Sequence, residues 1–149
     1  MTEREPSELI RAFLETQSTL ALATVDAEGQ PYVAPLFYVA DERLNLYWLS
    51  ASTSRHSVNL VARKRVFATV YPSVWQWNDI VGVQIQGDAE IIPDDRIREQ
   101  IMNLYLRKFQ LPPEFDTLIA GSTLYCLRPG WIRWMDNSVS FNYKTEINL

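Results

Sequence analysis

Three residues that could bind an anion, Ser54, Arg55 and His56, stand at the start of a predicted helix. They follow an apolar strand pattern over residues 44–50. A helix start carries free backbone N–H groups and the positive end of the helix dipole, so it favours an anion. Arg55 adds a bidentate donor and His56 a second one, whose pKa a phosphate dianion would raise. The pattern predicts a phosphate site; a solvated helix start capped by Ser52 or Ser54 is the alternative.

Other chemistries find less support in the same residues. Neighbours on a helix do not face each other, so His56 and Ser57 are not a hydrolase pair, and no G-x-S-x-G nucleophile elbow occurs. Asp94-Asp95 and Asp136 fit a helix start and a turn better than a pair of catalytic carboxylates. With 1 His and 1 Cys, the chain cannot form a closed His/Cys zinc site, and we predict no metal. We identify no catalytic side chain.

Length and composition predict one domain over residues 1–149, since 47% of these residues are hydrophobic. The net charge of −4, without a long basic run, argues against nucleic acid or an anionic membrane surface as partner. Cys126 is the only cysteine and is expected to be a buried hydrophobic residue. No signal-peptide pattern or membrane-spanning run is present, so we expect a cytoplasmic protein.

The elements that must position the anion site are mostly strands. Alternating apolar residues predict strands at 19–25, 31–39, 44–50, 66–71, 80–92, 124–135 and 139–143. Helical spacing predicts helices at 5–15, 54–63 and 94–108. The helix at 54–63 is expected to bury Val58, Val61 and Ala62. Because closure removes exposed strand edges, we predict a mainly β fold: a six- to seven-stranded antiparallel barrel with peripheral helices.

The order and spacing of several short motifs resemble a known family. These motifs are Phe37-Tyr38, Asp41 with Tyr47, Ser54-Arg55-His56, the run GVQIQG at 82–87, and Asp136-Asn137 with Phe141 and Lys144. Together they resemble the pyridoxamine 5′-phosphate oxidase-like split barrels that bind FMN, and within them the bacterial YhbP-like (UPF0306) proteins. The resemblance implies a split β-barrel homodimer with FMN in the groove between the two barrels.

The resemblance also implies where each part of the cofactor would lie. The phosphate would contact Ser54, Arg55 and His56, although larger relatives have Lys at the position of His56. The flavin ring would lie along the strand backbone at Ala34, Pro35 and Leu36. Pro35 in mid-strand removes one ladder donor, which fits an edge or a ligand-facing position; an ordinary edge strand is the alternative.

Three further candidates lie elsewhere in the sequence. Gln84, if it points inward together with Gln86, would need polar partners that a flavin could supply; an outward polar face is the alternative. Trp77, with Trp75 in the same loop, could stack on a flavin across the dimer or bury dimer surface. Lys144 resembles a family position near the phosphate or ring, and it could equally be a surface lysine.

We therefore predict an FMN-binding flavoprotein, a homodimeric oxidoreductase acting on an unknown small-molecule substrate or electron donor through non-covalently bound FMN. The His and Arg positions that bind substrate in the true oxidases are not evident, so we do not expect pyridoxamine phosphate oxidation. Two alternatives stay open. One is a non-enzymatic module that binds or senses flavin or haem, with His56 as the only histidine available to iron. The other is a reductase that uses the deazaflavin F420.

Overall fold

A computed structural model describes residues 4–149 of the chain. Its strands are β1 (Thr19–Val25), β2 (Pro31–Phe37), β3 (Val39–Ala40), β4 (Leu46–Ser50), β5 (Arg65–Val70), β6 (Val81–Ile91), β7 (Thr123–Asp136) and β8 (Lys144–Asn148). Its α-helices are α1 (Pro6–Thr16), α2 (Arg55–Ala62), α3 (Asp95–Phe109) and α4 (Asp116–Ala120). Two short 3-10 turns, η1 (Trp77–Asp79) and η2 (Pro113–Phe115), complete the set. No helix within residues 4–149 is long and apolar enough to cross a membrane.

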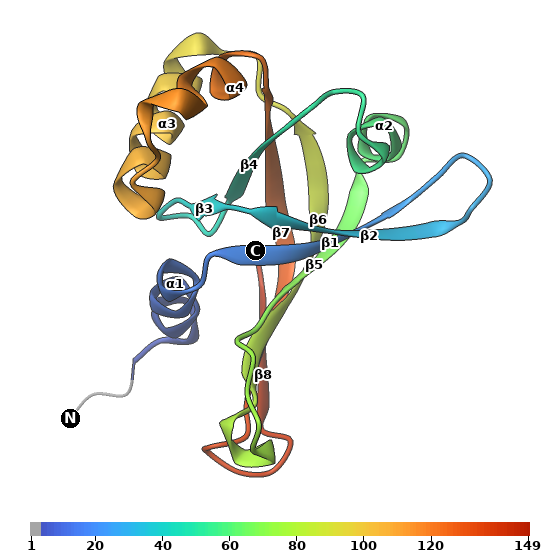
Figure 1. Cartoon of the computed structure of the whole chain (residues 1–149). Coiled ribbons are helices and arrows are strands. Elements are labelled where there is room, and N and C mark those ends of the chain that lie inside the picture. Colours follow the sequence, from blue (N-terminus) through green and yellow to red (C-terminus); the bar gives the residue numbers. More distant parts are fainter. Residues whose placement is uncertain (1–3) are drawn as a thin grey trace.

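The strands form one antiparallel sheet in the order β2-β1-β5-β6-β7-β4-β3, with β8 added beside β7. The sheet is strongly curled, and β1 and β2 run across the long strands β6 and β7 (Figure 1). Its two ends, β2 and β3, are consecutive in the chain with only Tyr38 between them. The predicted mainly β split barrel is thus confirmed, with one more strand than the six or seven expected because the segment 31–39 breaks at Tyr38.

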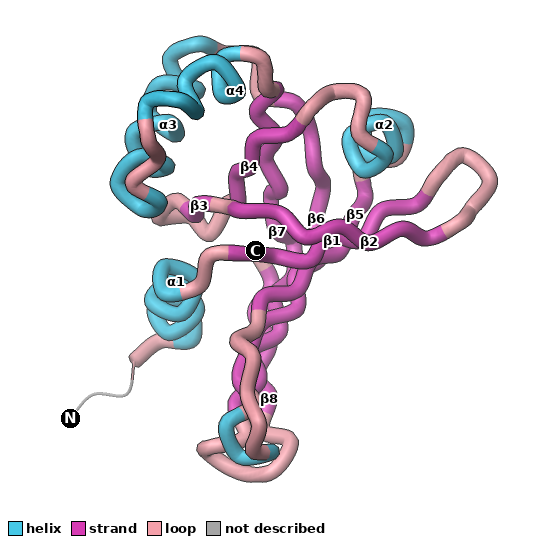
Figure 2. The backbone as a smooth tube through the Cα atoms, in the orientation of Figure 1, coloured by secondary structure: helices cyan, strands magenta, loops and turns pink. Residues whose placement is uncertain are grey.

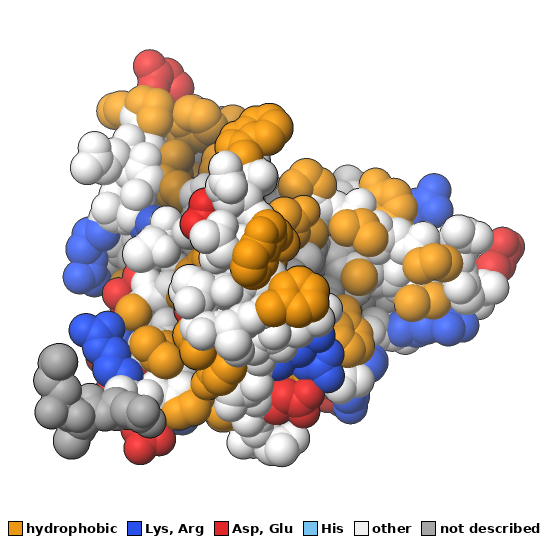
Figure 3. Space-filling view, turned by 90° about the horizontal axis from the view of Figure 1, so that it is seen from below, with side chains coloured by type: hydrophobic (Ala, Val, Ile, Leu, Met, Phe, Trp, Pro, Cys, Tyr) orange, Lys and Arg blue, Asp and Glu red, His pale blue; other side chains and the backbone are white. Residues whose placement is uncertain are grey.

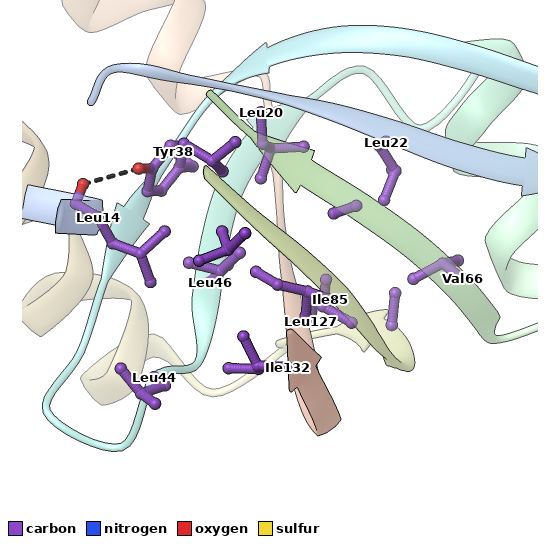
Figure 4. Close-up of a cluster of buried hydrophobic side chains, with 14 of the residues drawn as sticks. Leu14, Leu20, Leu22, Tyr38, Leu44, Leu46, Val66, Ile85, Leu127 and Ile132 are labelled. Carbon is purple, nitrogen blue, oxygen red and sulfur yellow. Dashed lines mark hydrogen bonds between the residues drawn. The ribbon is translucent and has the colours of Figure 1, made fainter. Parts of the chain in front are cut away.

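Helices surround this sheet without entering it (Figure 2). α3 and α4 lie together beside one end of the barrel, α2 lies across from them at the same end, and α1 packs near β3 (Figure 1). The core fills the inside of the curl with side chains such as Leu20, Ile85 and Ile132, none more than 2% exposed. The Tyr38 hydroxyl donates to the Leu14 carbonyl at 2.7 Å and fixes α1 against this core (Figure 4).

Glycines occur where the backbone requires them. Gly29 has φ of +86° in the β1–β2 hairpin, a backbone conformation that glycine adopts without strain. At Gly87 a Cβ would stand 2.1 Å from the Arg128 carbonyl oxygen, and the β6–β7 register shifts at this point. A β-bulge therefore lies at Gly87.

Two expectations about local structure were wrong. α2 exposes Val58, Val61 and Ala62, which were expected to be buried, and instead buries His56, Ser57, Asn59 and Leu60. The segment 139–143, predicted as the last strand, is part of a loop, and the last strand is β8. Side chains close that loop on itself: Asp136 Oδ1 accepts from the Ser138 N–H, and Asn137 Oδ1 accepts from the Asn142 N–H.

Candidate functional site

A compact polar cluster occupies the junction between β4 and α2. Ser50 Oγ lies 2.7 Å and Ser54 Oγ 3.1 Å from Nε2 of His56, and Ser54 Oγ lies 2.7 Å from Oγ of Ser57. The His56 side chain is turned inward, with 8% of its surface exposed. Burial lowers the pKa of His56, so the imidazole is neutral at pH 7. It serves as a hydrogen-bonding partner of the serines rather than as the second cation that the sequence suggested.

The start of α2 leaves its backbone N–H groups open to an anion. Ser54 occupies the N-cap position, but its hydroxyl donates to the Ala51 carbonyl and makes no cap bond to the helix. The first turn contains no acidic residue. Arg55 is exposed, and its guanidinium carbon lies 5.9 Å from the centre of the Tyr32 ring on β2. This helix start therefore combines free donors, a dipole and one cation.

The outer edge of β2 presents unpaired backbone groups. The Tyr38 N–H donates to the Ser18 carbonyl, which fixes the alternation of the antiparallel ladder with β1. By that alternation, the backbone groups of Val33, Pro35 and Phe37 point away from β1. Proline therefore costs this ladder no hydrogen bond, and the predicted edge position of Pro35 is confirmed.

We call the interval between two unpaired edges the split: residues 33–37 of β2 on one side and 48–50 of β4 on the other. β3 pairs only with Leu46 and Tyr47 of β4, so it leaves 48–50 uncovered. Tyr105 of α3 bridges the two strands, because its hydroxyl donates to the carbonyls of Phe37 at 3.0 Å and Tyr47 at 3.3 Å. Burial raises the pKa of the Tyr105 hydroxyl, which keeps it protonated and able to donate.

An apolar pocket of about 500 Å³ adjoins the split on the side of α3 and α4. Two strands and the segment from α3 to β7 supply its lining, which contains no charged side chain: Pro35, Leu36, Phe37, Leu49, Tyr105, Phe109, Leu111, Phe115, Leu118, Ile119 and Ser122. Pro35 and Leu36, both predicted to border a flavin ring, are part of it. The wall residues after Pro112-Pro113 were missed in the sequence, although the spacing of Phe115, Leu118 and Ile119 is helical.

A larger hollow of about 590 Å³ lies between the β3–β4 turn and α3, but its one carboxylate and one of its arginines are already paired. The Asp41 carboxylate accepts from Arg43, Asn45 and the Tyr47 hydroxyl. Arg128 forms an ion pair with Glu90. We therefore place the candidate site at the split.

Three predicted site residues lie elsewhere. Gln84 alternates with the fully buried Val83 and Ile85, so it points to the outer face of the sheet, and the inward orientation was wrong. Trp77 and Lys144 lie at the opposite end of the barrel from α2 (Figure 1). One chain thus brings together Ala34, Pro35, Leu36 and the start of α2, but not these three.

The opposite end forms a second feature, which we call the aromatic tip: Tyr71, Trp75, Trp77, Val139 and Phe141. Each of these side chains is at least 61% exposed. Trp77 meets Phe141 at 5.9 Å between ring centres, and its carbonyl accepts from the Asn137 side chain. Figure 3 looks at the molecule from this end and shows hydrophobic side chains scattered among polar ones.

The fold has many solved relatives of low sequence identity. A conserved hypothetical protein of Mycobacterium tuberculosis is 18% identical, with a TM-score of 0.76 over 91% of this chain and 90% of that one. A heme binding protein of Mycobacterium smegmatis is 16% identical, with a TM-score of 0.81 over 99% of this chain but only 60% of that one. HutZ, the heme storage protein of Vibrio cholerae, is 23% identical, with a TM-score of 0.71 over 85% and 91% of the two chains.

Comparison with curated proteins gave no match. The structural likenesses are all below 25% identity and show the fold alone, and the narrower YhbP-like subgroup stays a prediction. A family model settles the wider relationship, because the one described as pyridoxamine 5′-phosphate oxidase matches residues 6–135. This match spans all but the ends of the chain, and the structure has the expected split barrel. The protein therefore belongs to the pyridoxamine 5′-phosphate oxidase family.

Proposed function

We propose that the chain binds FMN non-covalently along the split and acts, as a homodimer, as an oxidoreductase on a small molecule. One observation carries the proposal: an anion site for the phosphate of FMN, an unpaired polar edge for its ring and an apolar pocket next to that edge follow one another along β2. The anion-binding start of α2 stands beside Tyr32, the unpaired backbone groups of the edge belong to Val33 and Pro35, and the apolar pocket begins at Pro35.

The residues of this chain have separate tasks in that arrangement. Arg55 and the first N–H groups of α2 would hold the phosphate, and the serines at 50 and 54 would supply hydroxyl donors. The N–H of Val33 and the carbonyls of Val33 and Pro35 offer a donor and two acceptors to the polar edge of a ring. When bound, FMN would supply the redox chemistry, while the chain binds and orients it.

The aromatic tip supports the dimer. Trp75 is 96% exposed and Trp77 61%, an unusual exposure for large aromatic side chains in a monomer. The outer face of the sheet adds Phe67 and Val33, which are 44% and 62% exposed. A second copy that covers this surface could bring its Trp77 and Lys144 to the split, where one chain alone cannot place them.

Replacement of Arg55 tests the phosphate site. Arg55→Ala removes a charged hydrogen-bond donor, so FMN affinity should fall by about 1.5–3 kcal/mol, or roughly 10- to 150-fold. Flavin fluorescence titration measures this loss, with the wild type expected to show flavin absorption and tight uptake. Lys64→Ala is the matched control, because it removes an exposed cation just beyond the other end of α2. Equal affinities in wild type and Arg55→Ala would refute the assignment.

Haem is the second candidate ligand, because two of the structural neighbours are named for binding or storing heme. The neutral imidazole of His56 is the form that binds iron. Its Nε2 already contacts Ser50 and Ser54, so iron would have to displace these serines or use Nδ1. A Soret band that disappears in His56→Ala would favour haem over FMN. Competition between F420 and FMN would decide between the two flavin-type cofactors.

A further inference from the structure

The apolar pocket beside the split has a definite chemical character. Its lining includes Leu49 of β4, Phe37 of β2, and Tyr105 and Phe109 of α3. The ring of Phe109 lies 5.0 Å from that of Phe37 and 5.4 Å from that of Tyr105, in tilted arrangements. The pocket is thus bounded by a cluster of aromatic rings, which suits a flat aromatic ligand.

The polar side-chain atoms of the lining are already engaged. The Tyr105 hydroxyl donates to two backbone carbonyls, and the Ser122 hydroxyl donates to the Leu118 carbonyl at 2.7 Å. No charged side chain contributes to the lining. A charged ligand would lose its hydration here without gaining a counter-ion, so the pocket discriminates against ions. Its volume of about 500 Å³ falls in the range of small-molecule sites.

The position of the pocket connects it to the proposed cofactor site. Leu49 lines the pocket, and the next residue, Ser50, contacts His56 in the polar cluster at the start of α2. Along β2, Pro35 belongs both to the unpaired edge and to the lining. A compound in the pocket would therefore lie directly beside the proposed cofactor site.

We propose that this pocket is the substrate subsite and that its substrates are uncharged aromatic compounds of about two rings. Their position next to a flavin rests on the proposed function. The preference for neutral aromatic compounds rests on the lining alone. The same lining provides no histidine, cysteine or methionine, so it offers haem iron none of these ligands.

A matched pair of fluorescent probes tests the preference. N-phenyl-1-naphthylamine is neutral, and 8-anilino-1-naphthalenesulfonate has the same ring skeleton with one negative charge. Titrated into the full chain with and without FMN, the neutral probe should bind at least about tenfold more tightly than the sulfonate. Equal affinities, or no binding of the neutral probe, would overturn the proposal.

Two variants locate the bound probe. Leu118 lines the pocket and is 64% exposed, so Leu118→Glu places a carboxylate at its mouth without emptying the core. We expect at least about a tenfold loss of affinity for the neutral probe. Leu106→Glu is the control, because Leu106 is 46% exposed on α3 and lies outside the lining. Unchanged binding in Leu118→Glu, or an equal loss in Leu106→Glu, would refute the location.

The same titrations separate this proposal from the proposed function. Suppose that FMN does not bind, but that the neutral probe still binds more tightly than the sulfonate and more tightly to wild type than to Leu118→Glu. The flavin proposal then fails and the neutral aromatic pocket stands. If FMN binds while the probe does not distinguish Leu118→Glu from wild type, the pocket proposal fails alone. When both bind, the blue emission of the probe should be quenched by energy transfer to the flavin. The absence of such quenching would refute the adjacency of the two sites.

Discussion

Helix α3 begins on a side-chain cap, whereas α2 begins without one. The Asp94 carboxylate accepts from the N–H groups of Arg96 and Ile97 at 2.8 and 3.1 Å, and the last turn of α3 carries Arg107 and Lys108. α2 has no cap bond, no acid in its first turn and no base in its last turn. Local rules thus account for α3, while the start of α2 keeps a cation and free N–H groups where those rules favour an acid.

The two helices also differ in the face that they bury. α3 buries Ile101 and Tyr105, which lie one turn apart. α2 buries His56, Ser57 and Asn59 together with Leu60. Segments that contradict local rules in this way tend to be functional, because another requirement has shaped them. For α2 that requirement would be the polar cluster behind Arg55.

The buried face of α2 gives the largest expected effect. Leu60 is 1% exposed, so Leu60→Ala should lower the free energy of unfolding by about 2–5 kcal/mol. Val61 is 64% exposed, so Val61→Ala should change the free energy of unfolding of the monomer by less than about 0.5 kcal/mol. Denaturant unfolding at two protein concentrations measures both, since a dimer that covers Val61 would add a concentration-dependent loss. Similar losses of unfolding free energy in both variants at low concentration would mean that α2 buries Val61, as its valine pattern predicts.

The helix starts give a smaller effect. Asp94→Ala should cost about 0.5–2 kcal/mol of stability, because two N–H groups lose their acceptor. It should leave the Kd for FMN unchanged, whereas Arg55→Ala should weaken FMN binding with little loss of stability. Denaturant unfolding and flavin titration on both variants test this reciprocal pattern. A loss of FMN affinity in Asp94→Ala would show that the two helix starts are not independent.

Much of the sheet could be predicted because its signals are local. β1 was predicted with its observed bounds from alternating apolar residues. The pattern of α2 misled because Val58 and Val61 are apolar in sequence yet exposed in the chain, while Asn59 is polar yet buried. Asn59 is tolerated inside because its side-chain amide donates to Thr24 Oγ1 at 3.1 Å, a partner 35 positions away in the sequence.

The candidate site was predictable only in part. The start of α2 and the edge position of Pro35 depend on local signals, and both were found. The outward direction of Gln84 also follows from a local signal, its alternation with the apolar Val83 and Ile85, but both orientations were left open. The separation of Trp77 from Arg55 depends on the whole curl of the sheet. The pocket wall depends on how α4 folds back toward β2.

The smallest effect concerns the protonation of His56. Burial lowers its pKa below the ordinary value of 6.5, so the unfolded chain binds the proton more readily than the folded one. Stability should therefore be undiminished above about pH 7 and fall as the pH drops from 6.5 toward the folded pKa. His56 is the only histidine, so His56→Gln should remove this part of the pH dependence while the carboxylates still contribute theirs.

Denaturation midpoints at pH 7.5 and 5.5, for wild type and His56→Gln, measure the difference. Equal losses in both proteins would mean that His56 is as basic in the folded chain as in the unfolded one. Saturation with FMN sharpens the test, because a phosphate dianion beside His56 would raise its pKa and reduce the loss at pH 5.5. If saturating FMN leaves the loss unchanged in the wild type, the phosphate does not contact the imidazole. The sequence placed His56 among the phosphate ligands, and this comparison decides whether it belongs there.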